Sequence, residues 1–184
     1  MTSDEFRIED NVLWLVYPAP CYMRDVRGFM SECLNAGERH IQGGGNMEYM
    51  QLTEWLEKAT KDRSLQATDS VTSAETFLAY RVEDGALIGC CQLRHHLTDK
   101  TKICGGHVGY EVRPSQRGKG YGKLILKAVI EHAKQRGMEY LRLDVDARNI
   151  ASKRTIEECG GVYTGTDKVG NGGTFQDVMH YNFS

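Results

Sequence analysis

Residues 105–122 read GGHVGYEVRPSQRGKGYG, and the other elements of the chain can be placed around this stretch. Its first half predicts a strand that ends at Pro114, and its second half predicts a turn, rich in glycine and basic residues, at the start of a helix. Such a turn presents main-chain N–H groups and positive charge, which are what a phosphate group binds. The stretch is therefore predicted to hold the phosphates of a cofactor.

The composition is typical of a soluble globular protein, and the length of 184 residues predicts a single domain, residues 1–184. Hydrophobic residues make up 40% of the chain and charged residues 26%, so a sizeable core can form. The net charge of -2 gives no overall basic field, so nucleic acid is not an expected partner.

Three further features of the sequence concern membrane partners, cellular location and the chemistry of the cysteines. No run of about 18 apolar residues is present, so no membrane partner is expected. The N-terminal segment MTSDEFRIED is acidic and lacks an apolar stretch, so we expect no signal peptide and a cytoplasmic location. The six cysteines include no C-x-x-C pair, and a chain of this length does not need disulfides, so neither a zinc site nor a disulfide framework is indicated.

The spacing of apolar residues predicts the elements of the chain. Expected strands are 12–17, 75–82, 86–93, 107–113, 140–145, 162–169 and 174–183. Expected helices are 22–39, 47–61, 122–136 and 149–159, with the glycine run 43–45 as a flexible break and 62–74 as a loop.

The order of these elements predicts an α/β (α+β) fold. The strand–helix–strand unit from 107 to 145 implies one parallel pair, because a crossover helix joins its two strands. The Asp84-Gly85 turn and the glycine-rich turn at 170–173 imply hairpins, and therefore antiparallel neighbours. We expect a mixed, mainly antiparallel sheet of about six to seven strands with helices on both faces.

Two nucleotide-binding motifs compete for the turn, and its spacing disfavours both. A P-loop has four residues between its glycines and then Lys and Ser or Thr, whereas Gly118 and Gly122 enclose three residues and Leu124 follows Lys123. A dinucleotide fingerprint needs G-x-G-x-x-G directly after the strand, whereas this G-x-G-x-G is delayed by residues 114–117. A solvated basic turn that only starts a helix is the remaining structural alternative.

The third match extends beyond the turn. Arg117 to Gly122, RGKGYG, resembles the R/Q-x-x-G-x-G/A motif of the GNAT superfamily of N-acetyltransferases, and Val112-Arg113-Pro114 looks like the end of the family's strand. Downstream, LDVDARNIASKRTIEECGG is similar to the next strand and helix, with an N-x-x-S pattern at Asn149. The resemblance covers about 105–161. With LRHHL before it, the stretch is similar to a bacterial subgroup of predicted acetyltransferases with no assigned substrate.

The resemblance implies that acetyl-CoA is the co-substrate, with no metal. It also implies that the parallel strands 107–113 and 140–145 splay apart and that the pantetheine arm lies between them. The main-chain N–H of Val112 would then polarise the thioester carbonyl. The implied cofactor-binding residues are Tyr110, Val112, Arg117, Gly118, Lys119, Gly120, Tyr121, Gly122, Lys123, Asn149 and Ser152.

Acid–base chemistry is the part of the site on which the sequence leaves alternatives. Transfer to an amine requires a group that takes a proton, and the resemblance points to Asp144 or Glu111. Each could instead be an ordinary salt-bridge partner. The tyrosine that many members use to protonate the departing thiolate is replaced by Ile156, so Ser152 is the nearest alternative donor.

Together these features predict an N-acetyltransferase that transfers an acetyl group directly to a primary amine. A small molecule is favoured over a protein as the acceptor. Its site is expected at the two N-terminal helices, the segment 97–104 and the final hairpin, where Arg94 either lines the acceptor side or pairs with an acid. A non-catalytic module that binds acyl-CoA is the alternative, and a homodimer is possible.

Overall fold

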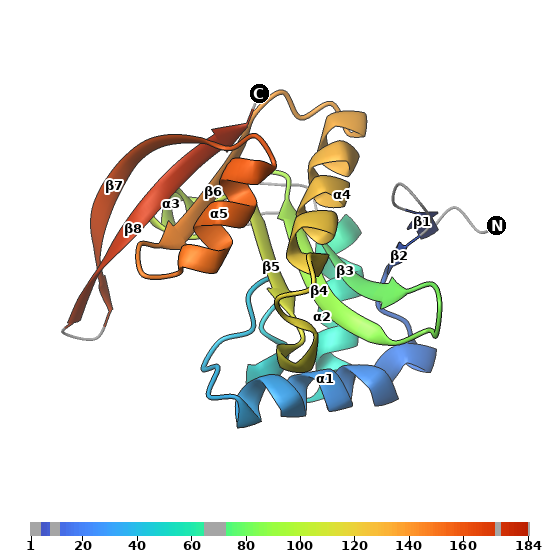
Figure 1. The fold of residues 1–184 in the computed structure, drawn as a ribbon. Helices are drawn as coiled ribbons and strands as arrows, with labels where there is room; N and C mark the ends of the chain where they lie inside the picture. The colour runs from blue at the N-terminus through green and yellow to red at the C-terminus, as the bar shows by residue number, and fades with distance from the viewer. Residues whose placement is uncertain (1–4, 8–11, 65–72, 172–173, 184) are drawn as a thin grey trace.

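The elements follow the expected order along the chain, with additions near the N-terminus and before the strand 108–112. The computed structural model describes residues 5–7, 12–64, 73–171 and 174–183 (Figure 1). The strands are β1 (Glu5–Arg7), β2 (Leu13–Val16), β3 (Ala74–Arg81), β4 (Leu87–Arg94), β5 (Val108–Val112), β6 (Leu141–Asp146), β7 (Val162–Asn171) and β8 (Thr174–Phe183). The α-helices are α1 (Met23–Asn35), α2 (Leu52–Ser64), α3 (Asp99–Ile103), α4 (Tyr121–Gln135) and α5 (Ile150–Glu158).

The strands form two sheets rather than the single sheet that we expected. The larger sheet has the order β1-β2-β3-β4-β5, and the smaller has the order β6-β8-β7. Every ladder between described strands is antiparallel. The expected α+β class with mainly antiparallel strands is confirmed, whereas the expected union of all strands in one mixed sheet is wrong. The crossover helix α4 joins β5 of one sheet to β6 of the other (Figure 1).

The two sheets touch where β5 and β6 begin. The N–H of His107 donates to the carbonyl of Arg142 at 2.7 Å, and the N–H of Arg142 donates to Nδ1 of His107 at 2.9 Å. Gly106 lies against the same carbonyl, where an added Cβ would stand 2.4 Å from the oxygen. No ladder joins β5 to β6 among the described residues, so past this contact the edge of β5 is open.

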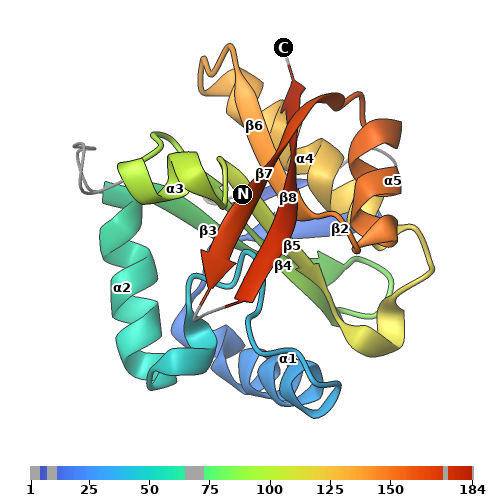
Figure 2. The same cartoon turned by 90° about the vertical axis from the view of Figure 1, so that its left-hand side faces the viewer.

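Helices cover both faces of the larger sheet, as expected (Figures 1 and 2). The alternation of side chains along β3 divides the core: Phe77 packs toward α4, and its neighbour Leu78 packs toward α1 and α2. The α4 side is filled by Ile125, Leu126, Val129 and Ala133, and the opposite side by Val26, Phe29, Cys33 and Trp55.

The end of α1 differs from the expected end at 39. The helix stops at Asn35 because Gly37 takes a positive φ of 89°, and the N–H of Glu38 turns back to the carbonyl of Cys33. The chain then returns toward the sheet, where a 3-10 turn, Met47–Tyr49, precedes α2. The expected start of the second helix at 47 was therefore too early.

The segment 97–104 contains a short helix that we did not predict. Thr98 caps α3, since its side chain accepts a hydrogen bond from the N–H of Thr101. The strand β1 was not predicted either. Most of the expected loop 62–74 and part of the turn 170–173 lie outside the described residues. Within the part of the chain that the structure describes, no helix has the length and apolar character needed to cross a bilayer.

Candidate functional site

The turn before α4 is shaped by glycines in left-handed conformations. Gly118 has φ 74° and Gly120, the residue that precedes the helix, has φ 83°. No described residue accepts a hydrogen bond from the main-chain N–H groups of residues 118–122. An added Cβ at either glycine would meet nothing within 4 Å, so the two glycines lie at the surface of the turn. N–H groups without partners at a helix start are suited to bind a phosphate.

The basic side chains of this turn are already held by partners. Arg117 donates to Glu38 at 2.7 Å and to Glu111 at 2.9 Å, and its Nε donates to the carbonyl of Val112 at 3.1 Å. Lys123 pairs with a carboxylate of α5 at 2.8 Å. Lys119 contacts only neutral oxygens among the described residues. The free positive charge at the turn is thus smaller than the sequence suggested.

Tyr121 contributes to the turn through its main chain. Its hydroxyl accepts a hydrogen bond from Arg81 at 3.0 Å, so the side chain points back toward β3 and away from the open space. Like the side chains of Arg117 and Lys123, that of Tyr121 is thus held by a partner within the protein.

The open edge of β5 carries the main-chain groups of Tyr110 and Val112. The main-chain N–H of Arg113 donates to a carbonyl of β4, and a main-chain N–H of β4 donates to the carbonyl of His107. The odd-numbered residues therefore form the ladder between β5 and β4. Hydrogen bonding alternates in an antiparallel pair, and the N–H of Val112 therefore points to the other edge, toward the gap beside β6. This direction is the one that contact with a thioester carbonyl would require.

Glu111 lies beside this edge on the face toward α1. Its side chain is 13% exposed and is paired with Arg117. Burial raises the pKa of Glu111, and the nearby charge of Glu38 adds to the effect, whereas Arg117 and the N–H of Val112 act in the opposite direction. The structure thus brings together three of the predicted site residues, Val112, Glu111 and Arg117.

Ser152 and Tyr110 form a second group on the opposite face of β5. Their hydroxyls are 3.0 Å apart. Asn149 caps α5 by accepting a hydrogen bond from the N–H of Ser152 at 3.0 Å. Burial raises the pKa of Tyr110, so its phenol is neutral. Ile156, at the position of the missing tyrosine, is buried in the core.

Asp144 lies apart from both groups, in a network of its own. Its carboxylate is 1% exposed and accepts hydrogen bonds from Arg142 Nε at 2.8 Å, His180 Nδ1 at 2.7 Å and the N–H of Gly105 at 2.9 Å. The sequence left a salt bridge open as the alternative role of Asp144, and the structure contains this salt bridge, with Arg142 as the partner. Asp144 ties the chain before β5 to the smaller sheet.

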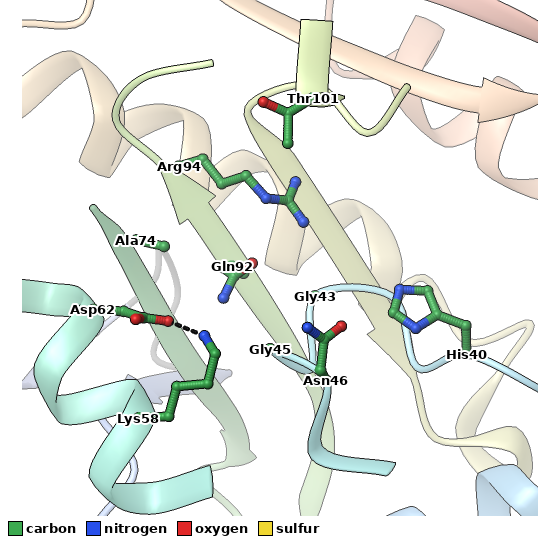
Figure 3. Close-up of a pocket in the computed structure, with 10 residues that line it drawn as sticks. All are labelled: His40, Gly43, Gly45, Asn46, Lys58, Asp62, Ala74, Gln92, Arg94 and Thr101. Carbon is green, nitrogen blue, oxygen red and sulfur yellow. Dashed lines mark hydrogen bonds and ion pairs between the residues drawn. The ribbon is translucent and has the colours of Figure 1, made fainter. Parts of the chain in front are cut away.

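A polar cavity of about 360 Å³ opens on the α1–α2 side of the larger sheet (Figure 3). Its walls come from the segment 40–46, α2, the start of β3, the end of β4 and α3. The lining residues are His40, Gly43, Gly45, Asn46, Lys58, Asp62, Ala74, Gln92, Arg94 and Thr101. Two of the segments expected to meet the acceptor, the second helix and 97–104, line it. No described residue of α1 or of the final hairpin does.

The cavity borders the strand that carries the open edge. Gly43 packs directly on β5, since an added Cβ would stand 2.3 Å from the carbonyl oxygen of Gly109. Gly109 immediately precedes Tyr110. One wall of the cavity, Gly43, therefore rests on the strand that leads to the turn before α4.

His40, a lining residue, is oriented by a buried acid. Its Nδ1 bonds to Glu48, whose side chain is 1% exposed and also accepts the N–H of Ile41 at 3.2 Å. The ring of Tyr49 stacks on the imidazole. An imidazole held through one nitrogen can exchange a proton through the other.

Sequence reasoning did not find the residues that line this cavity, apart from Arg94. The run 43–45 was interpreted as a flexible break, whereas Gly43 and Gly45 have positive φ values of 74° and 64° and pack against the sheet. Adjacent glycines also mark a loop that approaches another backbone closely. The glycine run 43–45 was therefore the feature of the sequence that could have indicated close packing of this loop.

Comparison with known proteins agrees with the geometry. Residues 44–161, more than half of the chain, match the family model described as "Acetyltransferase (GNAT) family". No curated protein matches the sequence.

Solved structures share the whole fold at low identity. RimL, a ribosomal L7/L12 alpha-N-protein acetyltransferase in complex with coenzyme A, has a TM-score of 0.73 and 15% identity, covering 98% of this chain and 97% of that one. MccE, a microcin C7 self-immunity acetyltransferase in complex with acetyl-CoA and AMP, has a TM-score of 0.71 and 15% identity, covering 95% and 93%. An acetyltransferase from Salmonella typhimurium that modifies the N-terminal serine of L7/L12 has 0.70 and 15%, covering 95% of each chain.

Proposed function

The chain belongs to the GNAT family of acetyltransferases, and on this premise we propose that it transfers the acetyl group of acetyl-CoA directly to a primary amine. The observation that carries the proposal is the continuity of one strand. Beyond its end stand N–H groups that have no acceptor among the described residues, its open edge bears the N–H of Val112, and Gly43, which lines a polar cavity, packs on its residue Gly109. Such an arrangement holds two reactants on either side of one backbone segment.

The co-substrate is inferred from the turn and from the structural relatives. RimL and MccE, which share the fold, are in complex with coenzyme A and acetyl-CoA. The N–H groups of residues 118–122 would bind the pyrophosphate, with Lys119 as the least compensated charge nearby. Acetyl-CoA supplies an activated acetyl thioester. The N–H of Val112 would hold its carbonyl oxygen and stabilise the charge that develops there.

The remaining steps belong to acids and bases of the chain. An amine reacts only when neutral, so one proton must leave the acceptor for a base, and the departing sulfur takes up a proton or leaves as thiolate. Glu111 suits the base because burial raises its pKa and because it lies beside Val112. Asp144 stays the second candidate. Ser152, bonded to Tyr110, is the proposed donor to the sulfur.

Variants separate these roles. Glu111→Gln should lower kcat by about tenfold or more and leave the affinity for acetyl-CoA within about threefold, since a base acts in the transition state and not in cofactor binding. Asp144→Asn is expected to behave likewise if it is the base, and His40→Gln belongs in the same series because His40 lines the cavity. Loss of acetyl-CoA binding in parallel with turnover would contradict a role as base.

A small molecule is the favoured acceptor. The cavity volume of about 360 Å³ falls at the lower end of the range for small-molecule sites. Isothermal titration should detect acetyl-CoA binding, and thiol release across a panel of amines should detect transfer. Binding without release from any amine would favour the alternative, a module that binds acyl-CoA without catalysis. The absence of binding at high micromolar acetyl-CoA would reject both functions.

A further inference from the structure

Arg94 places a partly buried positive charge in the cavity, and no acid of the described residues forms an ion pair with it. Figure 3 shows its guanidinium pointing into the cavity from the end of β4. One nitrogen donates to the carbonyls of Gly105 and Gly106, at 3.2 and 3.1 Å. No described residue accepts a hydrogen bond from its other two nitrogens, and none forms an ion pair with it. Asp144 acts on Arg94 only over a longer distance.

The other charged groups of the cavity are balanced in pairs. Lys58 is paired with Asp62, and His40 is bonded to Glu48. The further polar side chains of the wall, Asn46, Gln92 and Thr101, are neutral. Arg94 is therefore the uncompensated charge among the described lining residues.

A guanidinium in this position has a strong preference for one kind of ligand. Removing a charge from water is costly unless an opposite charge meets it, and burial lowers the pKa of Arg94 for this reason. The planar guanidinium offers parallel N–H donors that match a carboxylate or a phosphate, and such bonds are among the strongest in proteins. The neutral amides and hydroxyl around it can complete the hydrogen bonds of a bound anion.

We propose that the acceptor is a small amine that also carries an anionic group, a carboxylate or a phosphate, and that Arg94 binds this anion. The proposal rests on the proposed function, because it names the acceptor class of the same site. With the anion at the end of β4, the amine would lie toward Gly43, the lining residue that packs on Gly109 of β5. Arg94 thus selects and orients the acceptor.

Matched amines test the proposal. The pairs are 4-aminobutyrate with 4-aminobutyramide and O-phosphoethanolamine with ethanolamine, so that carboxylate and phosphate are assayed separately. The wild type should favour the anionic member of at least one pair by about tenfold or more in kcat/KM, as one charge-assisted contact provides. Arg94→Gln should abolish this preference. Equal or better use of the neutral members, or a preference that persists in Arg94→Gln, would overturn the proposal.

A second variant and a control guard against indirect effects. Arg94→Lys keeps the charge but loses the paired donors, so it should retain part of the preference even if Arg94→Gln folds poorly. Lys102→Gln removes an exposed cation from α3 that does not line the cavity, and it should leave the preference unchanged.

A binding assay separates failure of the proposal from failure of the proposed function. The same four amines are titrated in the presence of coenzyme A and followed by calorimetry. Tighter binding of the anionic members, lost in Arg94→Gln, would support the anion site even if the protein acetylates none of them. Equal binding of anionic and neutral members would refute it even if some amine is acetylated. Acetyl-CoA affinity is measured in every variant and should not change.

Discussion

At the scale of single residues, burial and one hydrogen bond decide the protonation state of His107. Its ring is 7% exposed, and its Nδ1 accepts the N–H of Arg142. Accepting this bond requires the neutral form, and burial lowers the pKa of His107 to about 4. A histidine used in this way holds two strands together. The role of His107 in this contact is therefore structural.

The pKa of His107 predicts an acid dependence of stability. In the unfolded chain the ring takes a proton near its ordinary value of 6.5, whereas in the folded state it does so only near 4. Between these values the unfolded state binds more protons, so the free energy of unfolding should fall as the pH drops, by about 3 kcal/mol in total. Urea unfolding of wild type and His107→Asn at pH 7 and 4.5 measures this. A fall of equal size in both proteins would contradict the prediction.

At the scale of elements, the contact between β5 and β6 depends on a residue without a side chain. Gly106 combines a φ of 57° with a backbone approach that leaves no room for a Cβ. The carbonyl it faces, that of Arg142, is the acceptor of the hydrogen bond from His107. The opening between the strands therefore starts from a fixed point, the contact of His107 with Arg142.

Gly106→Ala should disrupt this contact. The added methyl would stand 2.4 Å from the Arg142 oxygen, so we expect a loss of about 2 kcal/mol or more in the free energy of unfolding, with weaker acetyl-CoA binding. Gly85→Ala is the matched control, because Gly85 also has a positive φ, 67°, but meets no atom within 4 Å. It should cost about 1 kcal/mol and leave binding intact. Equal effects in both variants would show that strain, not the clash, dominates.

The helix α1 is tied to the phosphate-binding turn through Glu32. Its carboxylate accepts hydrogen bonds from Arg113 and from the N–H of Ser115. Burial opposes ionisation, but these bonds outweigh it and lower the pKa of Glu32 to about 2. The tie should therefore contribute fully above the ordinary pKa of 4.5 and fade as the pH falls toward 2.

Glu32→Gln tests this tie. At pH 7 the variant should be less stable by about 1 kcal/mol, a value reduced for the solvent that screens a partly exposed pair. Thermal unfolding at pH 7 and at pH 2.5 gives the comparison. The difference between wild type and variant should shrink at the lower pH, and a constant difference would show that the carboxylate charge is not what stabilises the turn.

At the scale of the whole molecule, the proposed cofactor would bridge two sheets that touch at one end. The turn before α4 extends from the larger sheet, whereas Ser152 belongs to the helix that follows β6 of the smaller sheet. Tyr110 already reaches across this gap to Ser152. A ligand that fills the gap binds the folded state alone, so its binding energy should add to stability.

Acetyl-CoA should accordingly raise the unfolding temperature. At a hundredfold excess over Kd the gain is about 2.7 kcal/mol, or roughly 5–10 °C for a chain of this size. S-acetylpantetheine, which lacks the pyrophosphate, should give a much smaller shift at the same concentration. A scan of unfolding temperature against ligand concentration measures both. Equal shifts for the two compounds would refute the role of the N–H groups at residues 118–122.

The sequence by itself determined most of the elements and the class of fold, and it predicted a phosphate-binding turn, because all three follow from local patterns. Glycine positions, strand alternation and helix periodicity act over a few residues and can be read directly. The sequence also sufficed for the cap at Asn149 and the family resemblance, which rests on the spacing of Arg117, Gly120 and Gly122.

The tertiary structure alone decided how these parts meet. It divided the strands into two sheets, paired Arg117 with Glu38, held Asp144 in a network with His180, and assembled a cavity from segments as distant in sequence as His40 and Thr101. Each of these contacts joins residues that are distant in sequence, and their distances depend on packing, which no local pattern encodes. The sequence 105–122 thus predicts a phosphate site, whereas the ion pairs of its basic side chains and the nearby polar cavity exist only in the folded chain.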